Sequence, residues 1–560
     1  MANYSSQFVA QWCPMTTGIK KKPQLPDIPE GEQTSIVKGL LALLEQFAVR
    51  IQEQDEEIAR LKDEVSLLKG ERKRPKFKGS KLDSETDREA EADADSSGTP
   101  RKRAGSRKKA KTSQLTIHEE KTLAPAGPVP EGSIFKGYRD FFVQDLVIQA
   151  HNTRYRQERW ITPAGDTLVG ALPSSLRNRH FGPQLVSYIL YQHHHCQTTQ
   201  PLLLEQLREW GIDISSGQIN QLLVCGQKAF HEEKDDLLQV GLDVSSYVTV
   251  DDSGARHQGR NGYVTQIGND FFAWFCSTNS KSRVNFLELL RAGQQDYVLT
   301  EAALSYMQKQ KLPKAPLAQL RQRIGECIAN KHAWRTLLKA LAITSTRHCR
   351  IATEGALLGS VLHHGLCDDL AIVSDDAGQF NVLSHGLCWV HAERLIHKLL
   401  PLNEAHREDI TRVRGEIWDL YADLKSYKHQ PDIAQREALS QRFEVVFTQQ
   451  TRYASLNRTL KGIHSNKAEL LLVLERPEIP LHTNGSETDI RDYVKKRKVS
   501  GGTRSDEGRR CRDTFASLKK TCRKLDISFW QYIRDRLGIG ETTIHRLPDI
   551  VRERAAAPAY

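Results

Sequence analysis

The sequence lacks the features that mark membrane and secreted proteins. No apolar run reaches the roughly eighteen residues of a transmembrane helix, and the first residues lack the basic start and apolar stretch of a signal peptide. The ten cysteines stand singly, without a CxxC pair, which argues against a disulfide scaffold. We therefore expect a protein of the reducing cytoplasm that has no membrane partner.

The length and charge of the chain indicate its number of domains and its kind of binding partner. A chain of 560 residues exceeds one ordinary domain, so several domains are expected. It carries 80 Lys and Arg against 69 Asp and Glu, a net charge of +11. A basic balance favours a polyanionic partner, although charge alone does not separate DNA from RNA or from anionic lipid.

The N-terminal part predicts self-association. Residues 1–33 have the composition of a flexible tail, and residues 34–70 carry a heptad repeat. β-Branched residues dominate one heptad position and Leu the other, which favours a parallel coiled coil and hence a homodimer or higher homo-oligomer. The alternative is a single amphipathic helix that lies on its own chain. The two positions are occupied by Val37, Leu44, Ile51, Ile58 and Val65, and by Leu40, Phe47, Gln54, Leu61 and Leu68.

A charged linker and a helical region follow. Residues 71–132 have little to bury and are predicted to be disordered; the basic block 101–111 either contacts DNA phosphates or is simply solvated. Residues 133–235 are predicted to be a helical DNA-binding region. Within it, PLLLEQLREWGIDISSGQINQLL has the spacing of a helix-turn-helix, whose second helix would place Gln218 and Asn220 in a major groove. The consecutive His193, His194 and His195 are interpreted as surface histidines.

The rest of the chain predicts an α/β multidomain protein. SYVTVDD, GYVTQIG and FFAWFCST are three short β-rich runs that indicate an antiparallel meander, and a later strand, LAIVSDD, ends at Asp375. The expected parts are a first core segment at 236–390 with a helical insertion at 291–345, a second helical insertion at 391–480, a segment with a Glu-bearing helix and C-terminal helices at 481–540, and a tail at 541–560.

Acidic residues close two of these strands and begin a later helix. Asp251 and Asp252 end the first β-run, Asp375 and Asp376 end the later one, and Glu487 follows the turn-forming TNGS. Carboxylates gathered at one sheet edge repel each other and so favour divalent cations, and two Mg²⁺ ions can support phosphodiester cleavage and strand transfer. Side chains alternate along a strand, so only one Asp of each pair can face such a site. Spacing alone leaves open which one, and single Asp residues at strand ends are often only turn formers.

Several sequence blocks resemble those of the insertion-sequence 66 transposase family. These are VTVDDSG, SDDAGQF followed by CWVHAER, and HTNGSETDIR, within a similarity that runs from about residue 133 to 537. The resemblance implies a DDE transposase with an RNase H-like mixed sheet and large helical insertions. It also implies that Asp251, Asp375 and Glu487 are both the catalytic residues and the ligands of two Mg²⁺ or Mn²⁺ ions.

This chain departs from the family in two places. Its first block is Asp-Asp-Ser where the family usually has Asp-Glu-Thr. It has no cysteine between Cys13 and Cys196, where many members carry a zinc-binding segment, so zinc is not expected and the helix-turn-helix would recognise the transposon ends.

Residues near the three carboxylates are candidates for DNA contact. In the CWVHAER block, His391 and Arg394 are expected beside the active site, facing a scissile phosphate. Cys388 and His391 have the spacing of a metal pair, but two further ligands would be needed. A basic stripe after Glu487 would hold the DNA backbone, or Arg491 would form a surface pair with Glu487. The stripe is formed by Arg491, Lys495 and Lys496, and Arg283 is a further DNA-facing candidate.

The expected function is that of an insertion-sequence transposase that binds transposon ends and target DNA. It would act near the nucleoid in a bacterial cytoplasm. Accessory proteins of the same element are further candidate partners. Two alternatives remain: an RNase H-like nuclease that cuts without joining, and a catalytically inactive DNA-binding or oligomerisation protein.

Overall fold

The computed structural model describes residues 116–557, apart from residues 136, 139–140, 174–175, 177–179, 366–368 and 541, together with five positions between 43 and 54. The predicted tail 1–33, nearly all of the coiled coil 34–70 and the linker up to residue 115 lie outside the described residues and stay predictions. Contacts divide the chain into a unit at residues 50–151 and a second unit formed by the rest. The two units are described separately.

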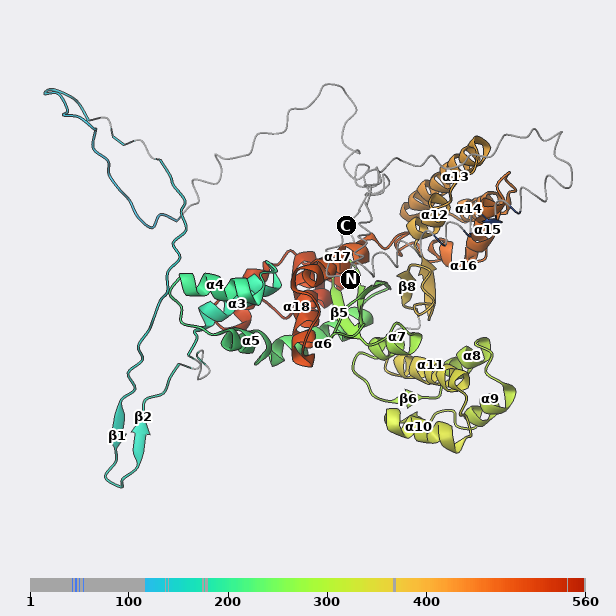
Figure 1. Cartoon of the computed structure of the whole chain (residues 1–560), viewed down its shortest axis with the longest axis horizontal. Coiled ribbons are helices and arrows are strands. Elements are labelled where there is room, and N and C mark those ends of the chain that lie inside the picture. Colours follow the sequence, from blue (N-terminus) through green and yellow to red (C-terminus); the bar gives the residue numbers. More distant parts are fainter. Residues whose placement is uncertain are drawn as a thin grey trace, which may run out of the picture. The chain divides into compact units, whose positions relative to one another are not determined.

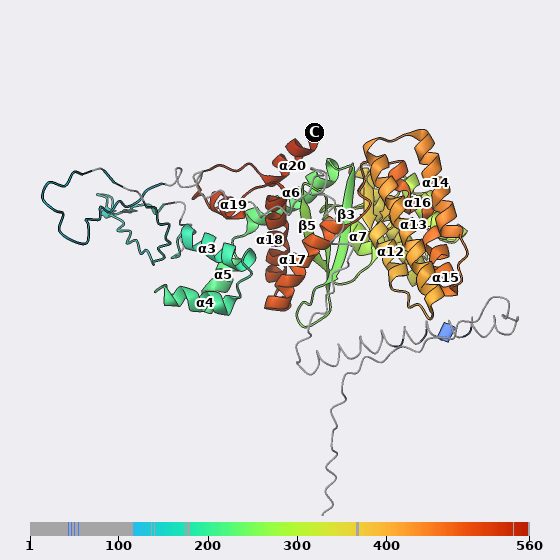
Figure 2. The ribbon, with the colours of Figure 1, turned by 90° about the horizontal axis from the view of Figure 1, so that it is seen from above.

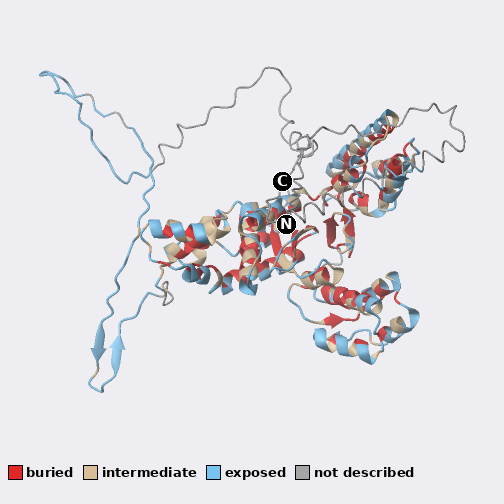
Figure 3. Cartoon of the chain, viewed as in Figure 1, coloured by how far each residue is buried: buried red, intermediate tan, exposed pale blue. Residues whose placement is uncertain are grey.

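The first described segment differs from the expected helical region 133–235. The described residues from 116 to 151 form no helix or strand, and apolar side chains such as Phe141 (89% exposed) and Val147 (80%) are open to solvent. In the other unit, β1 (Arg159–Ile161) and β2 (Thr167–Val169) form an antiparallel hairpin whose residues are all exposed (Figure 3). The first α-helix after this hairpin begins at Pro183. Apolar composition suggested globular helices here, but these side chains find no packing surface among the described residues.

Four helices then lead to the sheet: α3 (Pro183–His194), α4 (Gln200–Glu209), α5 (Ser216–Val224) and α6 (Lys228–Asp243). Gly211, with φ +77°, ends α4 in the left-handed region that glycine tolerates. Ser215 begins α5 with a capping box, because its side chain accepts from the Gln218 amide while the Gln218 side chain accepts from the Ser215 amide. The helix pair expected around Gly211 is therefore present.

A mixed five-stranded sheet forms the centre of this unit, in the order β5-β4-β3-β8-β9. The expected meander is confirmed, since β3 pairs antiparallel with β4, and β4 with β5. β8 lies parallel to β3, and β9 parallel to β8. The last strand was not predicted, because SHGL is short and contains no β-branched residue. The strands are β3 (Tyr247–Gly254), β4 (Tyr263–Gly268), β5 (Ala273–Thr278), β8 (Ala371–Ser374) and β9 (Ser384–Leu387).

Two C-terminal helices pack against the antiparallel half of the sheet, α17 (Asn484–Ser500) on β3 and β4 and α18 (Asp506–Lys524) on β5 (Figures 1 and 2). Strand β5 is an edge of the sheet, and α18 satisfies part of that edge. Backbone amides of Phe275 and Ala273 donate to the hydroxyls of Ser517 (2.9 Å) and Thr521 (3.1 Å). A covered edge cannot pair with another chain.

Helical segments interrupt the sheet at two points in the sequence. The segment between β9 and α17 has its own apolar core, which includes Leu420 and Phe443 and extends to Val373 of β8. The first segment comprises α7 (Arg283–Leu290), β6 (Tyr297–Val298), α8 (Glu301–Lys309), α9 (Lys314–Arg321), β7 (Cys327–Ile328), α10 (Lys331–Ala340) and α11 (Thr346–His363). The second comprises α12 (Trp389–His397), α13 (Glu404–His429), α14 (Ile433–Thr448), α15 (Ala454–His464), α16 (Lys467–Leu470) and η4 (Leu472–Leu474).

The C-terminal segment 541–560, predicted to be a tail, instead contains a packed helix. After α19 (Phe529–Arg536), helix α20 (Leu547–Ala556) packs against α6. Leu547 and Val551 lie one helical turn apart and are fully buried. That spacing was visible in the sequence, but only the surface of α6 makes its burial favourable. In the part of the chain that the structure describes, no helix combines the length and apolarity needed to cross a membrane.

Candidate active site

Strand β3 carries two neighbouring carboxylates that point in different directions. The strand runs through the core, where Val248 and Val250 are buried, and reaches Asp251 and Asp252 near its end. Successive side chains on a strand face opposite sides of the sheet. The two aspartates therefore meet different neighbours, although they are adjacent in sequence.

Asp251 lies within electrostatic reach of the two other predicted carboxylates. Burial, together with the charges of Asp375 and Glu487, raises the pKa of Asp251 to about 6. Asp375 directly follows β8, the parallel neighbour of β3, and its Oδ1 accepts from the Ala377 amide at 3.2 Å. Three distant stretches of sequence thus bring negative charge to one end of the central strands.

The neighbouring aspartates are held elsewhere. Asp252 accepts from the Thr265 hydroxyl (2.9 Å) and the Gln379 amide (2.8 Å), and Lys281 lies 4.0 Å away. Asp376 interacts instead with Glu469; burial and that carboxylate raise its pKa. In the first pair, Asp251 is the residue whose surroundings include Glu487, while the charge of Asp375 acts on Asp252 and on Asp376 as well. Gln379 was not singled out from the sequence, since a glutamine three residues after an Asp pair carries no recognisable signal.

Helix α17 positions Glu487 over β3. The buried Ser486 hydroxyl donates to Thr249 Oγ1 on β3 at 2.6 Å, which anchors the first turn of the helix. Glu487 Oε1 lies 3.3 Å from an Arg394 nitrogen and 3.4 Å from His391 Nε2, both on α12. The CWVHAER block therefore lies beside Glu487, and its two basic side chains contact that carboxylate in the described structure.

Cys388 and His391 lie together at the start of α12. Burial acts to lower the pKa of His391, but the neighbouring Cys388 and Glu487 outweigh it and raise that pKa. Among the described residues, no group of three or more His, Cys, Asp or Glu side chains is arranged to hold a metal ion. The expected absence of zinc stays a prediction, as does the expectation that the three carboxylates bind metal.

The predicted basic stripe of α17 is divided between surface and interior. Arg491 and Lys495 are exposed on α17. Lys496 is only 8% exposed, and its Nζ donates to the His193 carbonyl at 2.6 Å. One residue of the stripe therefore faces a packed interface, because consecutive helix positions point about 100° apart.

The other DNA-contact candidates also differ in placement. Arg283 points inward, where it donates to the Tyr306 hydroxyl at 3.0 Å and to the Gly378 carbonyl. Gln218 closes the capping box of α5, whereas Asn220 is exposed on the same helix and accepts from Gln200 at 3.4 Å. Both predicted recognition residues are exposed, and Gln218 is the one whose side chain is used in a cap.

His193 and His194 are not the surface histidines that the sequence suggested. The His194 ring stacks on Phe515 with 4.0 Å between centroids, and its Nε2 is buried without a hydrogen-bond partner. Burial, helped by Lys496, lowers the pKa of His193 to about 3. The end of α3 packs against α18, and the sequence of α3 alone could not reveal that contact.

The fold and these side chains define a mixed α/β protein with strand-end carboxylates and an adjoining basic helix. Residues 367–510 match the model of the Transposase IS66 family. An uncharacterized protein of Sinorhizobium fredii, y4jO, is 44% identical over 321 residues, which are 57% of this chain and 100% of that protein. The chain belongs to the IS66 family of transposases, as its sequence blocks indicated. The matched segment includes Asp375 and Glu487, whereas Asp251 precedes it.

Proposed function

We propose that this transposase cuts DNA at transposon ends and joins those ends to target DNA, with Asp251, Asp375 and Glu487 as its catalytic carboxylates. The single observation that carries the proposal is the electrostatic coupling of Asp251 to both Asp375 and Glu487. These residues are 124 and 112 positions apart in sequence, from 375 − 251 and 487 − 375. Carboxylates that lie close together repel each other and lower the stability of the fold. Their meeting from distant parts of the sequence therefore indicates a functional role.

We further infer that the sheet is an RNase H-like core. Three antiparallel strands are followed by two parallel strands, with Asp251 on the central strand and Asp375 at the end of its parallel neighbour. Helix α17 packs on the same central strand and contributes Glu487. The helical segments α7–α11 and α12–η4 then correspond to the insertions predicted within the core.

The donor set fits Mg²⁺ or Mn²⁺ better than zinc. Mg²⁺ is usually bound by one or two carboxylates, with waters and substrate phosphates completing the shell. Asp251 and Asp375 would hold one ion and Asp251 and Glu487 the other, without any three-residue protein cage. Two such ions would activate the attacking oxygen and stabilise the leaving oxygen. Arg394 and His391 are side chains in contact with Glu487, at 3.3 and 3.4 Å from its Oε1.

The chain's own residues would position the DNA. The exposed Arg491 and Lys495 lie on the helix of Glu487, so they are placed to contact the backbone near the cut. The α4–α5 pair, with Asn220 exposed, is suited to a major groove at the transposon end. Assembly through the predicted coiled coil would bring two ends together.

The proposal is tested with the purified full chain and a plasmid that carries the ends flanking its gene. Asp251→Asn, Asp375→Asn and Glu487→Gln should each reduce Mg²⁺-dependent cleavage by about a thousandfold or more, because each removes a charge from the proposed metal site. All three should still bind the ends in a gel-shift assay. Asp376→Asn is the matched control and should keep most of the cleavage, since it faces Glu469 instead.

The products distinguish the competing functions. Joined products on a target plasmid support the transposase, and cleavage without joining would leave the nuclease alternative. End binding without cleavage in the parent protein would leave the inactive DNA-binding protein. Full cleavage by Asp251→Asn, or its loss in Asp376→Asn alone, would contradict the assignment of the carboxylates.

A further inference from the structure

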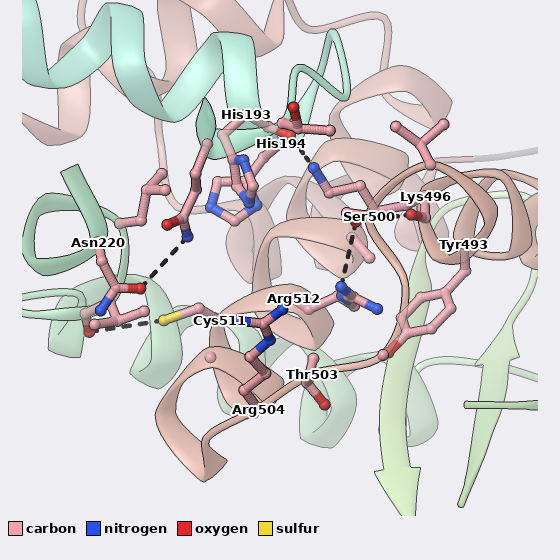
Figure 4. Close-up of a pocket in the computed structure, with 18 of the residues that line it drawn as sticks. His193, His194, Asn220, Tyr493, Lys496, Ser500, Thr503, Arg504, Cys511 and Arg512 are labelled. Atoms are coloured by element: carbon pink, nitrogen blue, oxygen red, sulfur yellow. Dashed lines mark hydrogen bonds between the residues drawn. The ribbon is translucent and has the colours of Figure 1, made fainter. Parts of the chain in front are cut away.

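A cavity of about 660 Å³ lies between the helix pair and the C-terminal helices. The ends of α3, α4 and α5 form one side, and α17, α18 and the loop between them form the other (Figure 4). Its volume falls in the range of small-molecule sites and exceeds what a single phosphate ion requires. Helix α17 also carries Glu487, so the cavity and the candidate active site share one rigid element.

The lining of the cavity carries excess positive charge. Lys496, Arg504, Arg512 and Lys519 all line it, and none has a carboxylate within ion-pair distance among the described residues. Within the described part of the chain, Arg512 donates to the Gly501 carbonyl (2.9 Å) and the Ser500 hydroxyl (3.4 Å).

The acidic residues of the lining do not offset this charge. Asp489 lies 3.0 Å from Lys524, and Asp492 lies 2.7 Å from Lys520, so both carboxylates are already paired. Lys496 is buried and Arg512 and Lys519 are partly buried, and a cation that loses hydration without gaining a counter-charge is unfavourable. The lining is therefore suited to an anion.

Lys496 shows this cost most clearly. It is 8% exposed, and its ammonium group donates to one backbone carbonyl, that of His193. Burial, together with Arg512 and Lys519, lowers the pKa of Lys496 to about 7. A bound anion would supply the missing opposite charge and favour the protonated lysine.

Other residues that line the cavity are suited to an uncharged, flat group. Leu204, Leu223 and Val224 contribute apolar surface from α4 and α5. The His194 ring, fixed by its stacking on Phe515, has a buried Nε2 without a partner. Burial lowers the pKa of His194, so the ring is neutral and can exchange a hydrogen bond with a neutral polar atom.

We propose that this cavity binds one unpaired nucleotide of DNA, with its phosphate at Lys496, Arg504 and Arg512 and its base between His194 and the apolar wall. The proposal rests on the proposed function, because DNA is the polyanion that a transposase handles. A nucleotide leaves the duplex to enter such a site, at a cost of a few kcal/mol that contacts to base and phosphate offset. Holding it on α17 would fix the strand relative to Glu487.

The test measures binding of a fluorescein-labelled single strand of about 16 nucleotides to the full chain by anisotropy, in EDTA. Arg504→Gln and Arg512→Gln should each weaken binding about three- to tenfold and lower the salt slope by less than about 0.7, because each removes one of the cations that share a single phosphate. Arg510→Gln is the matched control on α18. Arg510 does not line the cavity and pairs with Asp235 at 3.5 Å, so binding should stay unchanged. Arg504 lies on an exposed loop, so its loss should leave the thermal melting curve unaltered.

Competition identifies the part of DNA that is bound. Deoxyadenosine monophosphate should displace the labelled strand at lower concentration than inorganic phosphate or deoxyadenosine does, and Arg512→Gln should remove that advantage. Phosphate competing as well as the nucleotide would overturn the base contact, and unchanged binding by both arginine variants would overturn the cavity. Cleavage is absent in EDTA, so Asp251→Asn should bind normally. If the nucleotide proposal fails, the assignment of the catalytic carboxylates is therefore unaffected. If the carboxylate assignment fails, the nucleotide proposal is likewise unaffected.

Discussion

At the scale of single residues, adjacent side chains of one type have opposite surroundings. Asp252 accepts two hydrogen bonds from side chains and lies near a lysine. Asp251 accepts a hydrogen bond from the backbone amide of Asp252 at 2.7 Å and lies near two further carboxylates. A buried carboxylate that faces like charges is destabilising while it is ionised. Residues that lower stability in this way are commonly the ones that function requires.

This contrast predicts a stability gain from an inactivating change. The pKa of Asp251 is about 6 in the folded chain against an ordinary value of 3.8. Because the carboxyl pKa is raised in the folded state, the free energy of unfolding decreases as pH rises from about 4 to 6. It stays at this lower value above about pH 6. Asp251→Asn removes the charge, so we expect the metal-free protein to gain about 1–3 kcal/mol at pH 7.5.

Urea unfolding in EDTA measures the gain. It should disappear near pH 3.5, where the parent carboxyl is protonated in both folded and unfolded states. An identical midpoint for parent and variant at pH 7.5 would show that Asp251 bears no such penalty.

At the scale of elements, local signals placed the end of α4 and the start of α5, while the burial of other elements depended on packing. The capping box at Ser215 and the turn at Gly211 follow from side-chain chemistry near the residue itself. The strand β9 and the burial of α20 depend on partners far away in sequence. Glycines inside helices also depend on distant partners, because the effect of adding a Cβ is set by the atoms that pack against that position.

Two mid-helix glycines should respond in opposite directions to alanine. A Cβ at Gly359 of α11 would collide with the Val298 carbonyl, whereas a Cβ at Gly415 of α13 would meet no atom within 4 Å. We expect Gly359→Ala to lower the free energy of unfolding by about 1–3 kcal/mol through overpacking. Gly415→Ala should raise it by about 0.5–1 kcal/mol through better helix propensity. Thermal denaturation of both variants checks this; stabilisation by Gly359→Ala would mean that α11 does not approach β6 closely.

At the scale of the whole molecule, buried charge ties the C-terminal helices to the helix that leads into the sheet. Glu233 of α6 is 2% exposed. It accepts from Arg536 (2.8 and 2.9 Å), from the Tyr532 hydroxyl (2.8 Å) and from the Leu547 amide (2.8 Å). Four donors from α19 and α20 thus satisfy one carboxylate, which makes the segment after residue 540 part of the fold.

Breaking this network should be costly. Glu233→Gln removes the buried one of the two carboxylates that pair with Arg536 and leaves only Asp535, so we expect a loss of about 2–4 kcal/mol in the free energy of unfolding. Asp236→Asn is the control, because its pair with Arg546 is about half exposed and should contribute less than about 1 kcal/mol. Chemical denaturation measures both, and equal effects would show that α19 and α20 are not anchored through Glu233.

The sequence alone determined the parts whose signals are local or whose motifs are contiguous. Strand alternation, helix caps and the blocks around Asp251, Asp375 and Glu487 were visible in it, and so was the family. Tertiary structure decided that Asp251 rather than Asp252 has Glu487 in its surroundings, and it placed His193, His194 and the buried Lys496 around a shared cavity. The physical reason is that backbone propensity depends on neighbours in the chain, whereas burial and charge depend on neighbours in space, which here come from segments hundreds of residues apart.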